Sequence, residues 1–421
     1  VSKSGNLVIV LNGEVYNTDE LCNWADINSL QLNGHSDTEV VLECFERKGI
    51  EETVSRLDGI FSMVVFNISE ANVTLIRDIA GVKPLYYGLC RSGLVFSSNY
   101  NHITSHKFFR HKPIIPAAVA NFFNFGFIQE GEGLIEDTYF MPHGHIVKID
   151  AKGNIQTRNY KTISTLTSEA NLSDLVTNIV GTQLVSDVPL GTFMSGGVDS
   201  TLTTGIAARL SKGIKCFTIG VNDELIDESI EAERFGRYFA IDHKVYALTE
   251  EDIISALDQY VESAGEPLSD FSSLVTLKVC ELAKKELTVV LSGDGGDELF
   301  FGYPRFVQAA EAFEFLKASR SIRLFKILCR KAKGLQVPFI LMKFKNFGDY
   351  YLRKQGIPGS LFWANRLLKK SPTSPQYWYK FIYNELYDRE EALQFARQLE
   401  FHIHLQRVLL KVDRASMYHS L

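Results

Sequence analysis

What the chain lacks excludes several classes of protein. Its six cysteines follow no CxxC or metal-ligand spacing, which is typical of reduced core residues in a cytoplasmic protein and not of a disulfide framework or zinc site. No apolar run reaches the ~18 residues of a membrane-spanning helix, and Val337 to Met342 is too short. The net charge of −6 gives no electrostatic case for nucleic-acid binding. We therefore expect neither a membrane nor a nucleic acid as a partner.

The length and texture of the chain predict two domains. A chain of 421 residues with 45% hydrophobic and 22% charged residues is an ordinary globular sequence, but it is too long for one ordinary domain. Short strands and turns dominate residues 1–160, whereas longer helical patterns alternate with short apolar strands from residue 168. The second texture is typical of a parallel sheet with crossover helices. We place a Ser- and Thr-rich linker within 157–171 and predict domains at 1–158 and 168–421.

A glycine-rich segment, Ser195-Gly196-Gly197-Val198-Asp199-Ser200, follows an apolar run and precedes a helical pattern. It lacks the lysine of the Walker loop, so that class of nucleotide site is excluded. A strand, a glycine-rich turn and a helix nevertheless present backbone N–H groups and a helix N-terminus to an anion. The glycines let the backbone approach phosphate, and Asp199 can hold a divalent metal ion. A plain Ser-Gly-Gly turn is the alternative.

A second segment has the same design. Leu287 to Leu291 is expected to form a buried strand, and Ser292-Gly293-Asp294-Gly295-Gly296-Asp297-Glu298 follows at its carboxyl end. Ligands of open α/β sheets bind at that end of the strands, so the two segments can line one crevice. Closely spaced carboxylates repel one another unless a cation lies between them, and Mg²⁺ with a triphosphate satisfies this requirement. A tight acidic or calcium-binding turn is the alternative. Together the two segments predict ATP and Mg²⁺ as cofactors.

These motifs carry a resemblance to a known family. SGGVDS at 195–200 and SGDGGDELFFGYPRF at 292–306 together resemble the synthetase domain of glutamine-dependent asparagine synthetases, and KVDRASM at 411–417 resembles a helix of that family. LNGEVYN at 11–17 resembles the NGEIYN signature of the class II glutamine amidotransferase domain. Asn-Gly alone would indicate only a hairpin turn. Further matches follow in the family's order: GHSDTE at 34–39, LDGIF at 57–61, RD at 77–78 and KPLYY at 83–87.

The resemblance implies a fold and a glutamine site for residues 1–158. It implies an α+β, sheet-rich amidotransferase domain of the Ntn-hydrolase type. The Asn12 side chain and the Gly13 N–H would form an oxyanion hole, which glutamine hydrolysis requires because its intermediate carries an oxyanion. Glu14 and Asp37 would bind the glutamine backbone, since a carboxylate is the natural partner of an α-ammonium group.

The resemblance also implies an α/β synthetase domain with a parallel sheet and added helices. In that family, ATP converts the aspartate carboxylate to an acyl-adenylate, pyrophosphate leaves, and ammonia attacks. Asp199 and Asp297 would bind Mg²⁺, Asp294 would act on the intermediate, and Lys411 would stabilise the charged transition state. Phe193 and Ile219 would flank the adenine. The ATP-binding residues implied are Phe193, Ser195, Gly196, Gly197, Asp199, Ser200, Ile219, Ser292 and Gly293.

Both ends of the chain differ from the resembled family. The chain opens at Val1 in what is already the pattern of a core strand, whereas the family begins earlier, with the cysteine that serves as glutaminase nucleophile. It stops at Leu421, where the family continues. We expect a fragment of a longer gene product.

Several functions share this two-domain plan. Aspartate amidation, with glutamine and aspartate as the small-molecule substrates, is the first, and a homodimer is compatible with it. A synthetase that closes a β-lactam ring would not need Asn12, Gly13, Glu14 and Asp37, so their presence disfavours that reading. An amidotransferase acting on another carboxylate, such as a sugar acid, stays open. A non-catalytic sensor is expected to have lost acidic residues from the phosphate-binding segments, and they are present.

Overall fold

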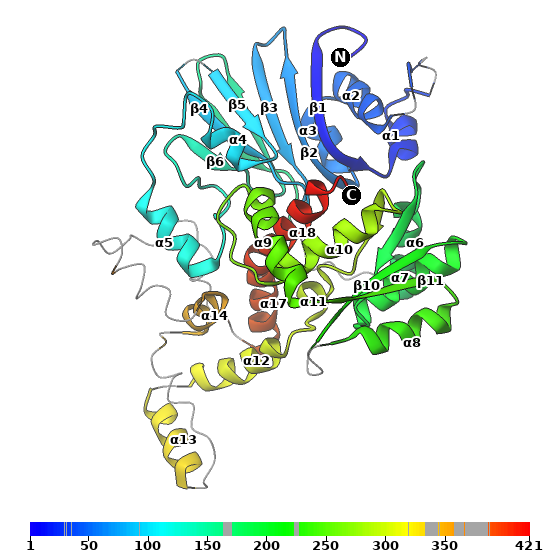
Figure 1. Ribbon diagram of the computed structural model, residues 1–421. Helices are drawn as coiled ribbons and strands as arrows, with labels where there is room; N and C mark the ends of the chain where they lie inside the picture. Colours follow the sequence, from blue (N-terminus) through cyan, green and yellow to red (C-terminus); the bar gives the residue numbers. More distant parts are fainter. Residues whose placement is uncertain are drawn as a thin grey trace.

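The amino-terminal half of the computed structural model is a two-layered β structure. An antiparallel sheet in the order β1-β2-β3-β7-β8 is covered on one face by α1, α2 and α3, and on the other by a smaller antiparallel sheet, β5-β4-β6 (Figure 1). The strands are β1 (Leu7–Val15), β2 (Gly59–Asn67), β3 (Asn72–Arg77), β4 (Tyr86–Cys90), β5 (Gly93–Ser97), β6 (Thr138–Phe140), β7 (His145–Asp150) and β8 (Ile155–Asn159). The helices are α1 (Thr18–Trp24), α2 (Asp37–Lys48), α3 (Ile50–Arg56), α4 (Tyr100–Thr104) and α5 (Pro116–Phe125).

The sequence of β2 explains why this sheet is buried on both faces. Successive side chains of a strand point to opposite sides, so Met63 and Val65 pack with the helices, whereas Val64 packs with the smaller sheet. A strand with apolar residues at consecutive positions can satisfy both layers.

The second half contains a four-stranded parallel sheet in the order β11-β10-β9-β12. Parallel neighbours need crossover connections, and helices provide them. The strands are β9 (Leu190–Phe193), β10 (Lys215–Val221), β11 (Asp242–Leu248) and β12 (Val289–Leu291). The helices are α6 (Leu172–Gln183), α7 (Val198–Leu210), α8 (Ser229–Phe239), α9 (Glu250–Ala264) and α10 (Ser272–Lys284).

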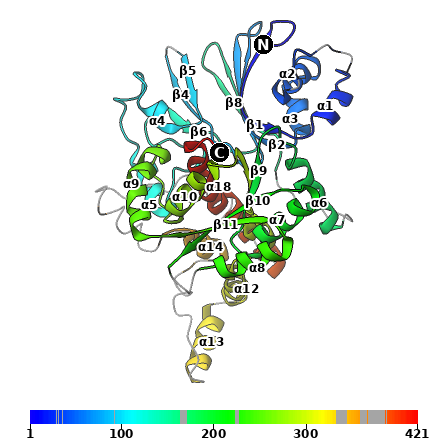
Figure 2. The ribbon, with the colours of Figure 1, turned by 45° about the vertical axis from the view of Figure 1, so that its right-hand side comes forward.

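The remaining described part is helical, as predicted. Its core consists mainly of aromatic and alanine side chains and includes Phe125 and Phe127 of the sheet-rich domain, and its last helix, α18, lies between the antiparallel sheets and helices α9 and α10 (Figures 1 and 2). A π-helical turn (Glu400–His404) precedes α18 (Leu405–Tyr418). The others are α11 (Gly296–Phe300), α12 (Pro304–Leu316), α13 (Arg320–Ala332), α14 (Phe347–Gln355) and α17 (Arg389–Leu399).

The structure describes the whole chain except residues 29, 31, 35, 92, 163–170, 223–226, 319, 333–343, 345, 358–365, 367–385 and 387. It confirms the fold class: a sheet-rich domain followed by an α/β domain with added helices. The helix predicted after the first glycine-rich segment begins at Val198, within that segment. Strand β12 is shorter than the strand predicted over Leu287 to Leu291. Most of the predicted linker lies outside the described residues, so the boundaries at 158 and 168 stay predictions. None of the described helices is both long enough and apolar enough to span a membrane.

Candidate active sites

The two glycine-rich segments meet at one end of the parallel sheet. β9 and β12 are paired parallel neighbours, so the segments that follow them leave the sheet side by side. A Cβ on Gly293 would lie 2.6 Å from the Ser200 nitrogen, and one on Gly296 would lie 2.3 Å from Asp199 Cγ. Both distances are too short for any real side chain. The structure therefore brings together the segments that the sequence predicted to line one crevice.

Hydroxyl groups shape the first segment, Ser195–Ser200. The Ser195 N–H donates to Ser200 Oγ over 3.1 Å, and the Gly197 N–H donates to Ser195 Oγ over 3.2 Å. Gly196 has φ of +92°, and a Cβ there would lie 2.9 Å from the Glu228 carbonyl oxygen. A glycine is required at this position because both the backbone conformation and the available space exclude a side chain.

Asp199 and Asp297, the predicted metal ligands, lie near each other. Burial raises the pKa of Asp199, and the neighbouring Asp297 charge raises it further. A cation between the two carboxylates would remove this repulsion. In the described part of the chain, no group of three or more His, Cys, Asp or Glu side chains could hold a metal ion by itself. Two carboxylates that share an ion with substrate phosphates fit Mg²⁺, which is usually bound in that way.

The two residues predicted to flank the adenine lie on neighbouring strands. Phe193 ends β9 and pairs with Phe217 of β10, and Ile219 lies two positions further along β10. Both side chains are half-buried and pack against the core cluster that contains Phe217. Their position at the ends of neighbouring strands is compatible with one apolar wall, while contact with adenine stays a prediction.

Asp294 and Lys411 have separate partners in the structure. Ser292 Oγ donates to Asp294 Oδ2 over 2.7 Å. Lys411 Nζ donates to Ser272 Oγ over 2.8 Å, and Ser272 Oγ donates to Asp270 Oδ1 over 2.6 Å. Burial alone would raise the pKa of Asp270, but Lys411, Ser272 and Arg407 lower it. Lys411 is thus held in the second domain by Ser272, near the charge of Asp270.

The predicted oxyanion hole lies on β1. Asn12 Nδ2 donates to Ser98 Oγ over 3.1 Å. Gly13 has φ of +132°, and a Cβ there would lie only 1.9 Å from the Ile60 carbonyl oxygen on β2. This close approach of two strands explains the glycine and fixes the direction of its N–H.

Glu14 and Asp37 lie together beside it. Asp37 begins α2, and its Oδ2 accepts the Val15 N–H over 2.9 Å, which joins the end of β1 to the helix. Burial raises the pKa of Glu14, the Asp37 charge adds to the effect, and Lys83 opposes it. Two neighbouring carboxylates favour a cationic ligand group such as an α-ammonium. His35 of the same motif lies outside the described residues.

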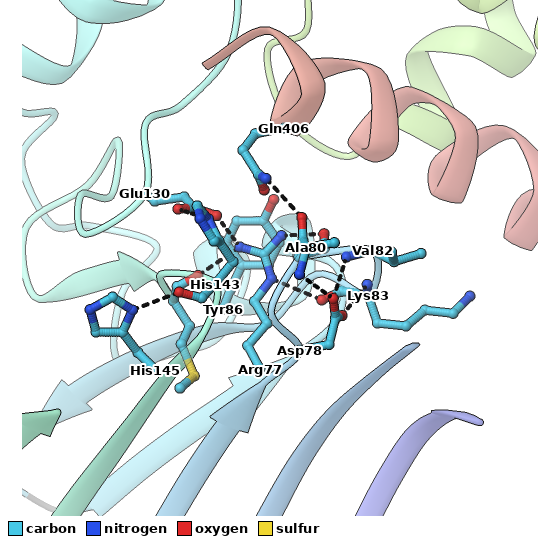
Figure 3. Close-up of polar contacts among 12 residues, drawn as sticks. Arg77, Asp78, Ala80, Val82, Lys83, Tyr86, Glu130, His143, His145 and Gln406 are labelled. Atoms are coloured by element: carbon cyan, nitrogen blue, oxygen red, sulfur yellow. Dashed lines mark hydrogen bonds and ion pairs between the residues drawn. The ribbon is translucent and has the colours of Figure 1, made fainter. Parts of the chain in front are cut away.

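The RD and KPLYY motifs form a buried junction that the sequence did not explain (Figure 3). Asp78 accepts the N–H groups of Ala80 and Val82 over 3.0 and 3.1 Å, and so shapes the turn after β3. Arg77 Nη1 donates to Glu130 Oε1 over 2.5 Å, and His143 Nδ1 lies 2.7 Å from Glu130 Oε2. Sequence reasoning missed these last two partners because they are remote in the chain and belong to no recognised motif.

The helix of the KVDRASM motif joins the two domains. Lys83 Nζ of the sheet-rich domain donates to Asp413 Oδ1 over 3.1 Å. Arg414 donates to the Ser98 carbonyl oxygen over 2.7 Å and to Glu266 Oε1 over 2.9 Å. Asp413 and Arg414 stand in a motif that the sequence had singled out, but their partners could not be found without the fold.

Comparison with known proteins agrees with this division. Residues 1–161 match the family of the glutamine amidotransferase domain, and residues 171–421 match the family described as asparagine synthase. The protein is thus an amidotransferase joined to a synthetase domain. More particularly, the chain belongs to the asparagine synthase family, whose members use ATP.

Similar proteins carry names from this family. A Methanocaldococcus jannaschii protein, provisionally named a glutamine-hydrolyzing asparagine synthetase, is 29% identical over 98% of this chain and 82% of its own length. The Bacillus subtilis glutamine-hydrolyzing asparagine synthetases 1 and 3 are each 29% identical, over 70% and 72% of this chain. The matches span about half of those two relatives, 47% and 53%.

Proposed function

We propose that the complete protein amidates aspartate to asparagine with ammonia released from glutamine. ATP activates the aspartate carboxylate as β-aspartyl-AMP, and the products are asparagine, glutamate, AMP and pyrophosphate. The observation that carries the proposal is the meeting of the two glycine-rich segments, with Gly293 and Gly296 packed against Ser200 and Asp199. Backbone N–H groups and two carboxylates at one end of a parallel sheet suit a magnesium-bound triphosphate.

The synthetase residues would have different roles in the adenylation of aspartate. A carboxylate is a poor electrophile, so its oxygen attacks the α-phosphorus of ATP and pyrophosphate leaves. The Ser195–Ser200 segment would hold the departing pyrophosphate with its N–H and hydroxyl groups. Asp199 and Asp297 would hold Mg²⁺, which neutralises phosphate charge when bound. Lys411 would face the negative charge that develops when ammonia attacks the adenylate.

The amidotransferase residues would supply the ammonia. Attack on the glutamine carboxamide produces an oxyanion, and the Asn12 amide and the Gly13 N–H would stabilise it. Glu14 and Asp37 would hold the α-ammonium group of glutamine. Ammonia must reach the adenylate unprotonated, since ammonium has no lone pair with which to attack. Residues of α18 contact both domains and would border the route between them.

The test is a product analysis with the full-length protein. Aspartate, Mg·ATP and either glutamine or ammonium are supplied, and asparagine, AMP, ADP and pyrophosphate are quantified. We expect equal amounts of asparagine, AMP and pyrophosphate with either nitrogen source. AMP formed only with a different carboxylate would retain the mechanism and replace the substrate, whereas ADP would contradict the adenylate.

A further inference from the structure

Helix α18 carries side chains that contact both domains. On α18, Lys411 binds Ser272 beside Asp270 in the synthetase domain, and Arg414 follows one turn later on the same helix. Arg414 Nη1 donates to the Ser98 carbonyl oxygen of the amidotransferase domain over 2.7 Å. The rigid backbone of a single helical turn therefore connects the two groups.

Arg414 has a fixed orientation. Its Nη2 donates to Glu266 Oε1 over 2.9 Å, and the Tyr86 hydroxyl also donates to that oxygen. The Arg414 and Glu266 side chains are 7% and 0% exposed. A guanidinium group is planar and presents its donors in a rigid fork, so two acceptors on two domains determine its position.

Ser98 connects Arg414 to the side chain of Asn12 in the proposed oxyanion hole. Its carbonyl oxygen accepts from Arg414, and its Oγ accepts from Asn12 Nδ2 over 3.1 Å. A side-chain amide has two N–H donors. The bond to Ser98 occupies one of them and leaves the second for the oxyanion of the reaction.

We infer that Ser98 is a positioning residue of the oxyanion hole and that Arg414 connects its position to the synthetase domain. The inference rests on the proposed glutamine hydrolysis and adds residues that orient Asn12 without touching the substrate. The contacts run from Asn12 to Ser98, from Ser98 to Arg414, and along α18 to Lys411.

The residues around Ser98 are closely packed. Gly265, which ends α9 with φ of +64°, lies so close to Asn99 that a Cβ on it would be 2.3 Å from Asn99 Oδ1. Glu266, the partner of Arg414, is the next residue. A displacement of this loop or of α18 must therefore move the segment that carries Ser98, because close-packed groups transmit strain.

The test compares serine variants of the full-length protein. Ser98→Ala removes the acceptor for Asn12, and we expect kcat for glutamine hydrolysis to fall by roughly tenfold, less than the 10²–10³-fold seen when an oxyanion donor is removed outright. The KM for glutamine should stay nearly constant, because the lost orientation matters in the transition state. Ser98→Thr keeps a hydroxyl and should restore most of the rate. Ser55→Ala, which removes an exposed serine hydroxyl on α3, is the control and should retain the normal kcat.

A second readout separates positioning from general damage. Synthesis driven by ammonium bypasses the glutamine site, so Ser98→Ala should leave ammonium-dependent AMP formation unchanged. An equal fall in both activities, or an unchanged kcat for glutamine, would overturn the inference. A failure of the proposed substrate would be visible separately, as AMP formation by the unaltered protein that does not depend on aspartate.

Arg414→Lys tests the connection to the synthetase domain. Lysine keeps the charge but lacks the fork that reaches both Ser98 and Glu266, so kcat for glutamine hydrolysis should fall severalfold. Arg47→Lys is the control, since Arg47 also donates to a carbonyl oxygen, that of Asp26, but lies on the surface. Normal glutamine hydrolysis by a folded Arg414→Lys protein would show that Ser98 does not depend on α18.

Discussion

The ionised Asp199 carboxylate is needed for the proposed binding of Mg²⁺, but it lowers the stability of the folded protein. The carboxylate lies against Gly296 and near Asp297, and burial followed by the Asp297 charge raises its pKa. An acid whose pKa is raised on folding destabilises the folded protein once the pH exceeds the ordinary value, here 3.8. The group is retained at this cost, which is typical of a binding site and not of a structural ion pair.

Asp199→Asn should therefore separate the two properties. Without Mg·ATP, the melting temperature at neutral pH should rise slightly. This gain should vanish as the pH falls below 3.8, where the Asp199 carboxyl group is uncharged in the folded and in the unfolded protein. Pyrophosphate exchange into ATP should fall on the order of 100-fold, because the loss of charge stabilisation amounts to a few kcal/mol. Asp258→Asn, an exposed position on α9, is the control. Unchanged exchange in Asp199→Asn would contradict its assignment as a metal ligand.

Gly296→Ala tests the geometry of the same site without altering a charge. The added Cβ would lie 2.3 Å from Asp199 Cγ, so the carboxylate must move. A displacement of about 1 Å can reduce a rate ~100-fold. We expect a loss of pyrophosphate exchange of about that size, measured beside Gly181→Ala, where the nearest atom is an ordinary 3.5 Å away. Full exchange in Gly296→Ala would mean that the position of Asp199 is not critical.

Among the elements, the turns and loops around Glu130 show what sequence patterns cannot reveal. The strand patterns, the glycine-rich segments and the order of the elements were readable because each is local. The partners of Arg77 were not, since Glu130 and His143 lie in loops whose approach depends on the packing of two sheets. The same holds for Ser98, which is one serine among many until β1 and the segment after β5 are placed side by side.

The Glu130 junction should contribute strongly to stability. Burial alone would raise the pKa of Glu130, but His143 and Arg77 lower it to about 2. Its contribution is therefore complete above the ordinary value of 4.5 and is lost as the pH falls from 4.5 to about 2.

Glu130→Gln should lower the free energy of unfolding at neutral pH by about 3–5 kcal/mol, because it leaves Arg77 buried without its counter-charge. The difference from the unaltered protein should shrink below pH 4.5, as urea denaturation across that range would show. Glu70→Gln removes an exposed ion-paired glutamate and should change stability by less than about 1 kcal/mol. A pH-independent difference for Glu130→Gln would contradict the ionised state of this carboxyl group.

At the scale of the whole molecule, α18 and the loop after α9 join the two domains through buried charge. Glu266 of the synthetase domain is fully buried and receives donors from Arg414 and from Tyr86 of the amidotransferase domain. The Tyr86–Glu266 and Arg414–Ser98 contacts cross between the domains and hold them in one relative position, which the proposed transfer of ammonia requires.

A double-mutant cycle measures the Arg414–Glu266 pair, whose two members each make one of the contacts between the domains. Glu266→Gln alone should destabilise the protein by about 3–5 kcal/mol, because Arg414 stays buried and charged. Adding Arg414→Met should recover a large part of that loss, and the coupling should exceed about 1 kcal/mol. Urea denaturation followed by fluorescence provides the values. Additive effects would mean that Glu266 and Arg414 do not depend on each other in the folded protein.

The most direct test of the proposed chemistry follows one oxygen atom. Aspartate labelled with ¹⁸O in its β-carboxylate is converted by the full-length protein with Mg·ATP and ammonium, and the phosphate-containing products are analysed by mass spectrometry. Attack of the carboxylate on the α-phosphorus transfers one labelled oxygen to AMP when ammonia displaces it. The account predicts ¹⁸O in AMP and none in pyrophosphate. Label in inorganic phosphate, with ADP as the nucleotide product, would contradict the adenylate and with it the function assigned to the two glycine-rich segments.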